Sequence, residues 1–287
     1  MRRTILDRCY DWGRSWIYPE GATSGHAQEE ADRFIEIDDR GSDVTLFAFA
    51  GLAAQFAGLP TFEFRRVLNQ CCPDSNLVFV RDVRRLSYHL TPEGERNGLE
   101  FYEAQVRLAM DSLGARYHVA LGTSVGGSAA LYFGARCQMD QVIAFSPAYP
   151  LTIYCTAWSQ LRTYLDLAKL VRSPEAYKEL AVITLGAWIC YLRLRRLVGK
   201  RKIWPVIETY RQSDPRPRAT VFYSAGCRPD AYQATLLDGL DELRRVAIPT
   251  PRHNCAGFLK ARNELADTIL REIQSGRDGQ ATRAREA

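Results

Sequence analysis

The chain has 287 residues, of which 46% are hydrophobic and 25% are charged. This length supplies one substantial core and is too short for two large domains. The net charge of +5 is small and is spread over many arginines, so it does not single out nucleic acid as a partner. We therefore expect one globular domain with room for an insertion, and no nucleic-acid partner.

The cysteines and the N-terminus indicate a cytoplasmic protein. The first eight residues carry charges where a signal peptide needs a continuous apolar core. The cysteines form no C-x-x-C pair and no cluster with histidine at metal-ligand spacing, so we expect reduced thiols, no metal and no cofactor. There are eight of them: Cys9, Cys71, Cys72, Cys137, Cys155, Cys190, Cys227 and Cys255.

Strands and helices alternate along most of the chain. We interpret residues 1–42 as a polar N-terminal arm. After it, the apolar run 44–49 predicts a strand buried on both faces, and the spacing over 62–68 predicts a helix. The elements expected after these are strands over 76–80, 117–121, 141–145, 218–224 and 244–248, and helices over 98–113, 125–137, 231–240 and 257–274.

This alternation predicts an α/β fold with a mostly parallel, doubly wound sheet. The core would comprise residues 43–147 and 218–274. Between them the strand pattern stops, and we interpret residues 148–217 as a helical cap inserted over the carboxyl edge of the sheet. The charged tail, residues 275–287, is expected to be disordered.

The predicted cap contains an apolar stretch followed by basic residues. The stretch 180–192 is shorter than the roughly 20 residues that span a bilayer. The basic cluster that follows, from Arg193 to Lys202, admits two interpretations: a peripheral membrane contact or anionic-substrate site, or the solvated end of a buried cap helix. We favour the second, because a cap must bury apolar residues against the core.

Ser124 is the strongest functional signal in the sequence. It lies at the centre of a G-x-S-x-G motif, Gly122 to Gly126, between an apolar strand and a stretch of small residues. A serine on such a sharp strand-to-helix turn projects its hydroxyl above the sheet, and glycines are needed where the turn closes on itself. The motif predicts an acyl-transfer nucleophile at the N-terminus of a helix, where backbone N–H groups stabilise an oxyanion.

A serine nucleophile needs a histidine base and a carboxylate that orients it. Of the four histidines, His118 lies in the same strand as Ser124, His26 in the arm and His89 after an earlier strand. His253 alone follows the last strand, in a loop that reaches the edge where Ser124 lies. The carboxylate expected in the loop after the preceding strand is Asp230, with Asp238 and Asp241 as weaker candidates.

An oxyanion site needs two N–H donors. One is predicted to be the amide of Val125, the residue after the nucleophile. The other should come from the loop after the strand 44–49, where Gly51 permits a tight turn and the amide of Leu52 or Ala50 is the candidate.

With these residues in the order Ser124, Asp230, His253, the chain resembles the α/β-hydrolase superfamily, from about Val44 to Ile273 with the cap as an insertion. More narrowly, it resembles small bacterial serine hydrolases and acyltransferases associated with surface polysaccharide assembly. It departs from that group in having Leu86-Ser87-Tyr88-His89 where members usually carry a Trp-Tyr pair. The segments that carry the narrower resemblance are Phe49–Gly51, Pro60–Phe64, Phe79–Asp82 and Phe145–Pro147.

The sequence therefore predicts a serine hydrolase that acts on a carboxylic ester or thioester, with a small-molecule or saccharide ester as substrate. An O-acyltransferase acting on a saccharide or another alcohol shares the first half of that chemistry. A peptidase would want an acidic residue near Ser124 to hold a substrate amine, and the sequence offers no obvious candidate. A non-catalytic hydrolase-like binding module is the alternative of a different class.

Overall fold

The computed structural model describes residues 33–51, 62–84, 86–148, 192, 194–197 and 205–286. Its centre is a seven-stranded sheet with the order β1-β3-β2-β4-β5-β6-β7. Only the edge strand β1 is antiparallel to its neighbour, so the mostly parallel sheet is confirmed. The strands are β1 (Ile35–Asp38), β2 (Val44–Phe49), β3 (Asn76–Val80), β4 (Tyr117–Thr123), β5 (Gln141–Phe145), β6 (Arg218–Ser224) and β7 (Leu243–Ile248).

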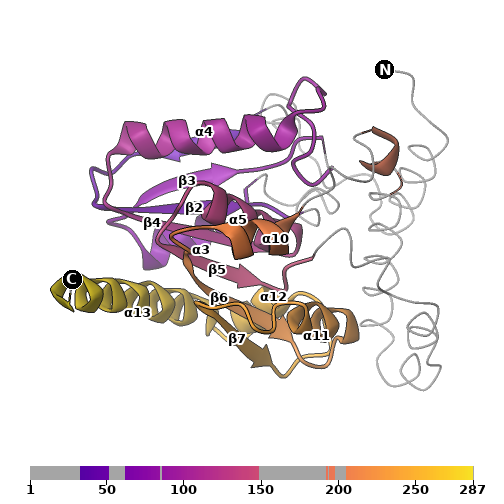
Figure 1. The fold of residues 1–287 in the computed structure, drawn as a ribbon. Helices are drawn as coiled ribbons and strands as arrows, with labels where there is room; N and C mark the ends of the chain where they lie inside the picture. Colours follow the sequence, from indigo (N-terminus) through magenta and orange to yellow (C-terminus); the bar gives the residue numbers. More distant parts are fainter. Residues whose placement is uncertain are drawn as a thin grey trace.

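Helices cover both faces of the sheet (Figure 1). One core is shared by α4, α5 and α10, and the other by α3, α12 and α13. This layering is the doubly wound arrangement that the alternation of strands and helices predicted. The helices are α3 (Arg65–Cys71), α4 (Gly98–Leu113), α5 (Val125–Arg136), α10 (Val206–Gln212), α11 (Arg228–Thr235), α12 (Cys255–Ala261) and α13 (Leu265–Glu286).

The central strands separate the two cores. In β2, Phe47 and Phe49 face the core shared with α4 and α5, whereas Leu46 and Ala48 face the other. Every residue of β2 is buried, as expected for a parallel strand covered on both faces. The helix α5 is also buried along nearly its whole length, so the segment after Ser124 runs through the interior of the protein.

The sheet begins earlier than the sequence analysis expected. Residues 35–38 lie inside the predicted arm, yet they form β1 and pair with β3, with Ile35 opposite Val80 and Asp38 opposite Leu77. The cause is visible in the sequence, since isoleucines and acidic residues alternate with the period of a strand. The rest of the arm that could bear on this boundary, residues 1–32, lies outside the described residues.

The C-terminal segment is helical rather than disordered. The single helix expected over 257–274 is two helices, and the second, α13, continues to Glu286. Two side chains from the sheet side hold its later turns: Arg218 Nη1 donates to Ser275 O at 2.7 Å, and Gln280 Nε2 donates to Asp140 Oδ1 at 2.8 Å. These contacts supply partners that the charged composition of residues 275–287 did not reveal.

Most of the predicted cap lies outside the described residues. Its C-terminal part is described and includes α10, which packs beside α5 on the sheet face (Figure 1). Val206 and Tyr210 of α10 lie in the same core as α5, and the Tyr210 hydroxyl donates to Pro217 O at 2.8 Å. The core therefore resumes by residue 206, before the boundary expected at 218. Among the described helices, none has both the length and the apolar character needed to cross a membrane.

Candidate active site

Ser124 lies on the sharp turn between β4 and α5. Its backbone has φ 55° and ψ −123°, a conformation that non-glycine residues rarely adopt, and its amide donates to Phe145 O at 2.9 Å. A Cβ at Gly122 would lie 2.1 Å from Gly126 O, and one at Gly126 would lie 2.1 Å from Phe49 O. Both glycines of the motif are therefore required by close backbone approach.

Ser124, His253 and Asp230 form one hydrogen-bonded chain. The Ser124 Oγ lies 2.9 Å from His253 Nε2, and His253 Nδ1 lies 2.6 Å from Asp230 Oδ1. His253 and Asp230 are both buried. With the proton on Nδ1 donated to the carboxylate, Nε2 has a lone pair directed at the serine hydroxyl.

The loops after β6 and β7 bring Asp230 and His253 together. The Gly226 amide donates to Thr250 O at 3.0 Å, and a Cβ at Gly226 would lie 2.9 Å from that same oxygen. Asp230 follows in the first turn of α11, and His253 stands just before α12, which Asn254 caps by accepting from the Gly257 amide at 2.7 Å. The two loops therefore fit against each other as one unit.

A buried polar group lies beneath His253. The Ser146 Oγ lies 3.4 Å from Ser224 Oγ, and Ser224 Oγ donates to the backbone oxygen of His253 at 3.4 Å. Ser146 also donates to Cys255 Sγ at 3.1 Å. These contacts tie the histidine loop to the ends of β5 and β6.

The other histidines and aspartates considered as partners for Ser124 have different hydrogen-bond or ion-pair partners where the structure describes them. His89 is buried and its Nδ1 donates to Ser87 O at 2.7 Å; burial lowers the pKa of its imidazole to about 4. His118 Nδ1 lies 3.8 Å from Asp140 Oδ2. Asp238 pairs with Arg245 and Asp241 with Arg216, both at exposed positions. His26 lies outside the described residues.

The candidate oxyanion donors are narrowed by the backbone. Val125 is the first residue of α5, so its amide has no carbonyl to bond within the helix. The Ala50 amide donates to Val80 O at 2.8 Å and is therefore committed to the sheet, which removes it as a candidate. Leu52 lies outside the described residues.

Glu63 is a residue near this site that sequence reasoning missed. Its Oε2 accepts a hydrogen bond from the Gly51 amide at 3.1 Å, and burial raises the pKa of this carboxyl to about 7. A Cβ at Gly51 would lie 3.6 Å from both Glu63 oxygens and 2.7 Å from Thr123 O. The sequence offered no obvious acidic residue near the serine turn, and the structure places Glu63 beside it. Glu63 lies in the turn two residues before α3, and no spacing to Ser124 marks it.

Cys227 was also not anticipated beside the acid–base pair. One ligand atom from each of Cys227, Asp230 and His253 lies within 4.8 Å of the others, a grouping that linear cysteine spacing could not show. Both ring nitrogens of His253 already have partners, since Nδ1 lies 2.6 Å from Asp230 Oδ1 and Nε2 lies 2.9 Å from Ser124 Oγ. The observed geometry thus favours a hydrogen-bonded pair.

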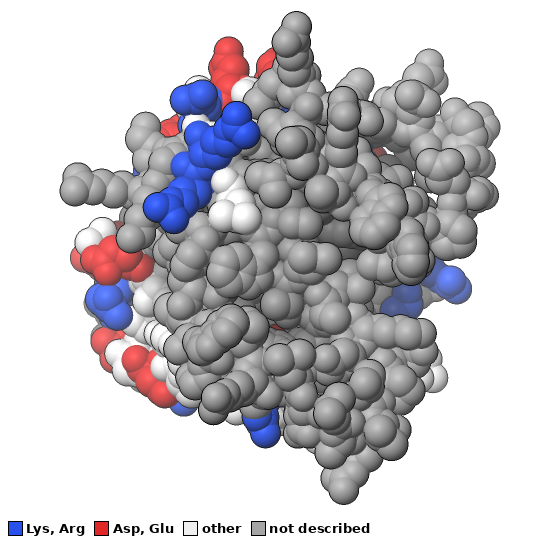
Figure 2. Space-filling model, turned by 90° about the vertical axis from the view of Figure 1, so that its right-hand side faces the viewer, with Lys and Arg blue, Asp and Glu red and all other residues white. Residues whose placement is uncertain are grey.

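The described surface above the carboxyl ends of the strands carries charges of both signs. Figure 2 looks onto this side, and the described Lys, Arg, Asp and Glu residues in the view lie interspersed around its margins. Of the basic cluster Arg193 to Lys202, the side chains of Arg195 and Arg196 are described; both are exposed, next to the buried Leu194. The remainder of the cluster lies outside the described residues.

No family model matches this sequence, and no curated protein matches it. Solved structures do match. A provisionally assigned esterase from Staphylococcus aureus is 13% identical, with a TM-score of 0.57 and 94% of each chain covered. An α/β hydrolase from a Medee basin deep-sea metagenome library is 17% identical, with a TM-score of 0.50, covering 84% of this chain and 94% of its own.

A third similar structure is the capsule O-acetyltransferase of Neisseria meningitidis serogroup A. It is 13% identical, with a TM-score of 0.51, and the match covers 84% of this chain and 90% of that one. Together with the sheet order and the layering, these matches show that the chain has the α/β-hydrolase fold.

Proposed function

We propose that the protein is a serine hydrolase that cleaves a carboxylic ester or thioester through an acyl intermediate on Ser124. The observation that carries this proposal is the chain of hydrogen bonds from Ser124 Oγ through His253 to Asp230, at 2.9 and 2.6 Å. A hydroxyl that lacks a base is a poor nucleophile at neutral pH, and this arrangement supplies both the base and the group that orients it.

The proposed reaction has two halves. His253 Nε2 takes the Ser124 proton as Oγ attacks the substrate carbonyl, and Asp230 stabilises the imidazolium. The amides of Val125 and Leu52 bind the oxyanion. When the tetrahedral intermediate collapses, His253 gives its proton to the departing alcohol or thiol and leaves an acyl-serine. Water, deprotonated by His253, then releases the acid and restores the serine.

The second acceptor decides between hydrolysis and transfer. If an alcohol reaches the acyl-serine in place of water, the same groups perform O-acylation. An O-acetyltransferase and esterases both occur among the similar folds, which supports either outcome for this chain. We therefore propose hydrolysis as the primary activity and O-acyl transfer to a saccharide or other alcohol as the second candidate.

Labelling with a fluorophosphonate tests the nucleophile. The purified protein should label, and Ser124→Ala should not, while keeping the wild-type melting temperature. Asp230→Asn should lower kcat for a p-nitrophenyl ester by about 10⁴-fold, because the imidazole loses its orienting carboxylate. Asp241→Asn is the matched control, since Asp241 pairs with Arg216 at the surface, and it should leave kcat unchanged.

Two results would contradict the proposal. Labelling that persists in Ser124→Ala would remove the nucleophile, and a wild-type protein that never labels would favour the binding-module alternative. Loss of activity with a chelator would instead assign Cys227, Asp230 and His253 to a metal. Adding alcohol acceptors to the ester assay separates the two candidate activities, since a transferase forms the new ester at the expense of the free acid.

A further inference from the structure

One peptide group next to the serine turn is held at both of its polar ends. The Tyr88 hydroxyl donates to Ala50 O at 2.7 Å, and the Glu63 carboxylate accepts from the Gly51 amide at 3.1 Å. The carbonyl and the amide belong to the same planar Ala50–Gly51 peptide. Two hydrogen bonds at opposite edges of the same rigid peptide group restrict its rotation about the chain direction more than either bond does alone.

This peptide group lies directly against the residues that flank the nucleophile. A Cβ at Gly126 would lie 2.9 Å from the Ala50 carbonyl carbon, and a Cβ at Gly51 would lie 2.7 Å from Thr123 O. Thr123 and Gly126 bracket Ser124 and Val125. A change in the orientation of the Ala50–Gly51 peptide would therefore be transmitted to the serine turn, because no space separates them.

The Tyr88 hydroxyl is aimed by a strained loop. Ser87 and Tyr88 both have positive φ, 55° and 63°, and the Asp82 carboxylate holds them there by accepting from the amides of Leu86 at 2.5 Å and Tyr88 at 2.9 Å. The Tyr88 ring is fully buried and lies edge-on to Tyr102, with the ring centroids 5.0 Å apart. Such backbone strain persists where the surroundings impose it, commonly at functional sites.

Glu63 is also placed at an energetic cost, the partial loss of water around its carboxyl. Its carboxyl is buried enough to raise its pKa to about 7, and the described residues offer it no ion pair. Arg65, two residues later, pairs instead with Glu36. Removing a carboxyl from water without pairing it with a cation has a free-energy cost even at a half-buried position, so packing alone does not account for Glu63.

We propose that Tyr88 and Glu63 are positioning residues for the oxyanion site of Ser124. By fixing the Ala50–Gly51 peptide against the serine turn, they hold the turn that presents the amide of Val125, the candidate oxyanion donor among the described residues. The proposal rests on the proposed function, because an oxyanion site is needed only if Ser124 carries an acyl intermediate. Neither residue exchanges a proton or a bond with the substrate.

Three variants test this with an ester substrate: Tyr88→Phe, Glu63→Ala and the two combined. Each single variant should lower kcat by about 10- to 100-fold, less than the loss of an oxyanion donor itself, and leave KM within about two-fold. The double variant should lose little more than the worse single one, because both bonds act on one peptide. Tyr102→Phe is the matched control, which removes a buried hydroxyl from the neighbouring ring and should leave kcat unchanged.

The conservative variant Glu63→Gln adds a measurement, the pH profile of kcat, that a residue serving only in packing would leave unchanged. Its amide oxygen still accepts from Gly51, so kcat should recover to within a few-fold of the wild type. In the wild type, the carboxyl becomes protonated as the pH falls through about 7 and accepts more weakly, which adds an acid limb to the profile of kcat. Glu63→Gln should lack this limb. The groups facing Glu63 are the Gly51 amide and Tyr88, whose raised pKa keeps its hydroxyl protonated throughout.

The outcomes separate this inference from the proposed function. If Ser124 labels fully with a fluorophosphonate in every variant, only more slowly, both proposals stand. If all variants label and turn over like the wild type, the positioning role is overturned and the nucleophile is kept. If Glu63→Gln lowers kcat as much as Glu63→Ala does, the positioning role is overturned. It is also overturned if the variants change only KM and the melting temperature, because the residues then serve only the stability of the fold. A wild type that does not label overturns the proposed function itself.

Discussion

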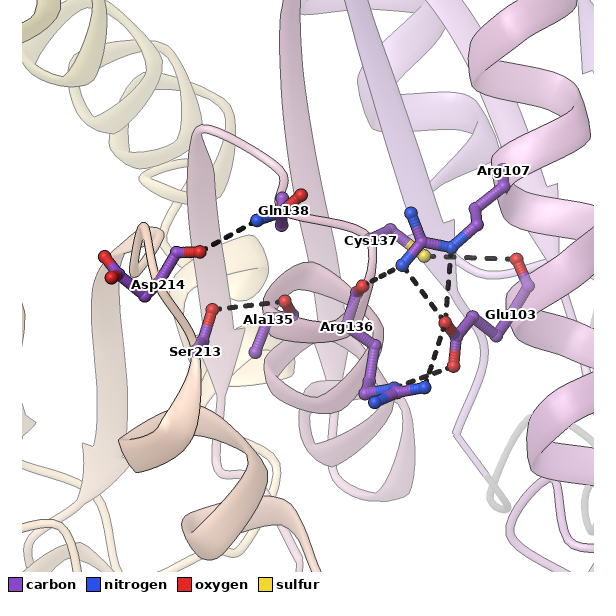
Figure 3. Close-up of polar contacts among 8 residues, drawn as sticks. All are labelled: Glu103, Arg107, Ala135, Arg136, Cys137, Gln138, Ser213 and Asp214. Atoms are coloured by element: carbon purple, nitrogen blue, oxygen red, sulfur yellow. Dashed lines mark hydrogen bonds and ion pairs between the residues drawn. The ribbon is translucent and has the colours of Figure 1, made fainter.

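The two ends of α5 are held in place by different forces. At the N-terminal end, Gly122 and Gly126 make close backbone contacts, and Ser124 adopts a rare conformation. At the C-terminal end, hydrogen bonds between charged side chains hold the helix. Glu103 of α4 accepts from Arg136 Nε at 2.8 Å and from Arg107 Nη2 at 3.1 Å (Figure 3). The N-terminal end of α5 therefore depends on close backbone packing at glycines, and the C-terminal end depends on hydrogen bonds between charged side chains.

The C-terminal end is also fastened on its other side. Ser213 Oγ donates to Ala135 O at 3.2 Å, and Gln138 Nε2 donates to Asp214 O at 2.8 Å (Figure 3). Arg107 additionally donates to the Arg136 carbonyl. This difference indicates that the strained backbone at Ser124 is held in place by interactions made elsewhere along α5. The free energy that keeps α5 in register comes from its buried length and its polar anchor, far from the reacting atoms.

The largest effect is expected at the glycine end. Gly126→Ala should destabilise the fold by at least about 3 kcal/mol and abolish fluorophosphonate labelling, since its Cβ would overlap the Phe49 carbonyl. Gly134→Ala, later in the same helix, is the matched control. Its Cβ would meet a methyl group of the buried Val142 at 2.6 Å, a side-chain contact rather than a backbone one, so it should cost less than Gly126→Ala, about 1 to 2 kcal/mol, and leave labelling intact. Urea denaturation measures both, and equal costs would refute the backbone explanation.

An intermediate effect is expected at the charged end. Glu103→Ala should lower the free energy of unfolding by about 2 kcal/mol, because it removes the shared acceptor of two guanidinium groups from a mostly buried position. The kcat of the folded variant at 25 °C should stay within two-fold of the wild type. A large fall in kcat without a fall in stability would show that Glu103 acts on the candidate site rather than on the stability of α5.

The smallest effect is expected from one half-exposed arginine. Arg107→Ala should cost less than about 1 kcal/mol, since water screens its charge and Arg136 still pairs with Glu103. The cost should shrink further when the salt concentration is raised from 0.05 to about 0.5 M. Thermal unfolding at both salt concentrations measures it. A cost that is independent of salt would mean that the bond to the Arg136 carbonyl, rather than the ion pair, carries the contribution.

The features that the sequence predicted correctly depend on short stretches of neighbouring residues. The strands, the doubly wound sheet and the glycines around Ser124 follow from patterns within about ten residues, and these were confirmed for β2 to β7. Asp230 and His253 were chosen by their place after β6 and β7, and the structure brings both to Ser124. Glu63 and Tyr88 meet at Ala50–Gly51 only through the packing of α3 and the loop after β3, and no linear spacing encodes that meeting.

The elements that were misjudged share a different cause. Residues 35–38 have a strand pattern but sit in a polar context, and β1 gains its stability from the edge of β3. The charged residues after 274 lack an obvious core face, yet Arg218 and Asp140 hold them in α13. In both cases a distant partner decides the local structure, which composition alone does not reveal.

The order of the parts along the chain has a consequence for synthesis. Ser124 and the Ala50–Gly51 peptide precede β5 in the sequence, whereas Asp230 and His253 follow β6 and β7. A ribosome-bound chain that stops before β7 thus has its serine without a base. On the proposed mechanism, activity therefore begins only after β7 has paired with β6 and the loop that follows β7 has brought His253 to Ser124.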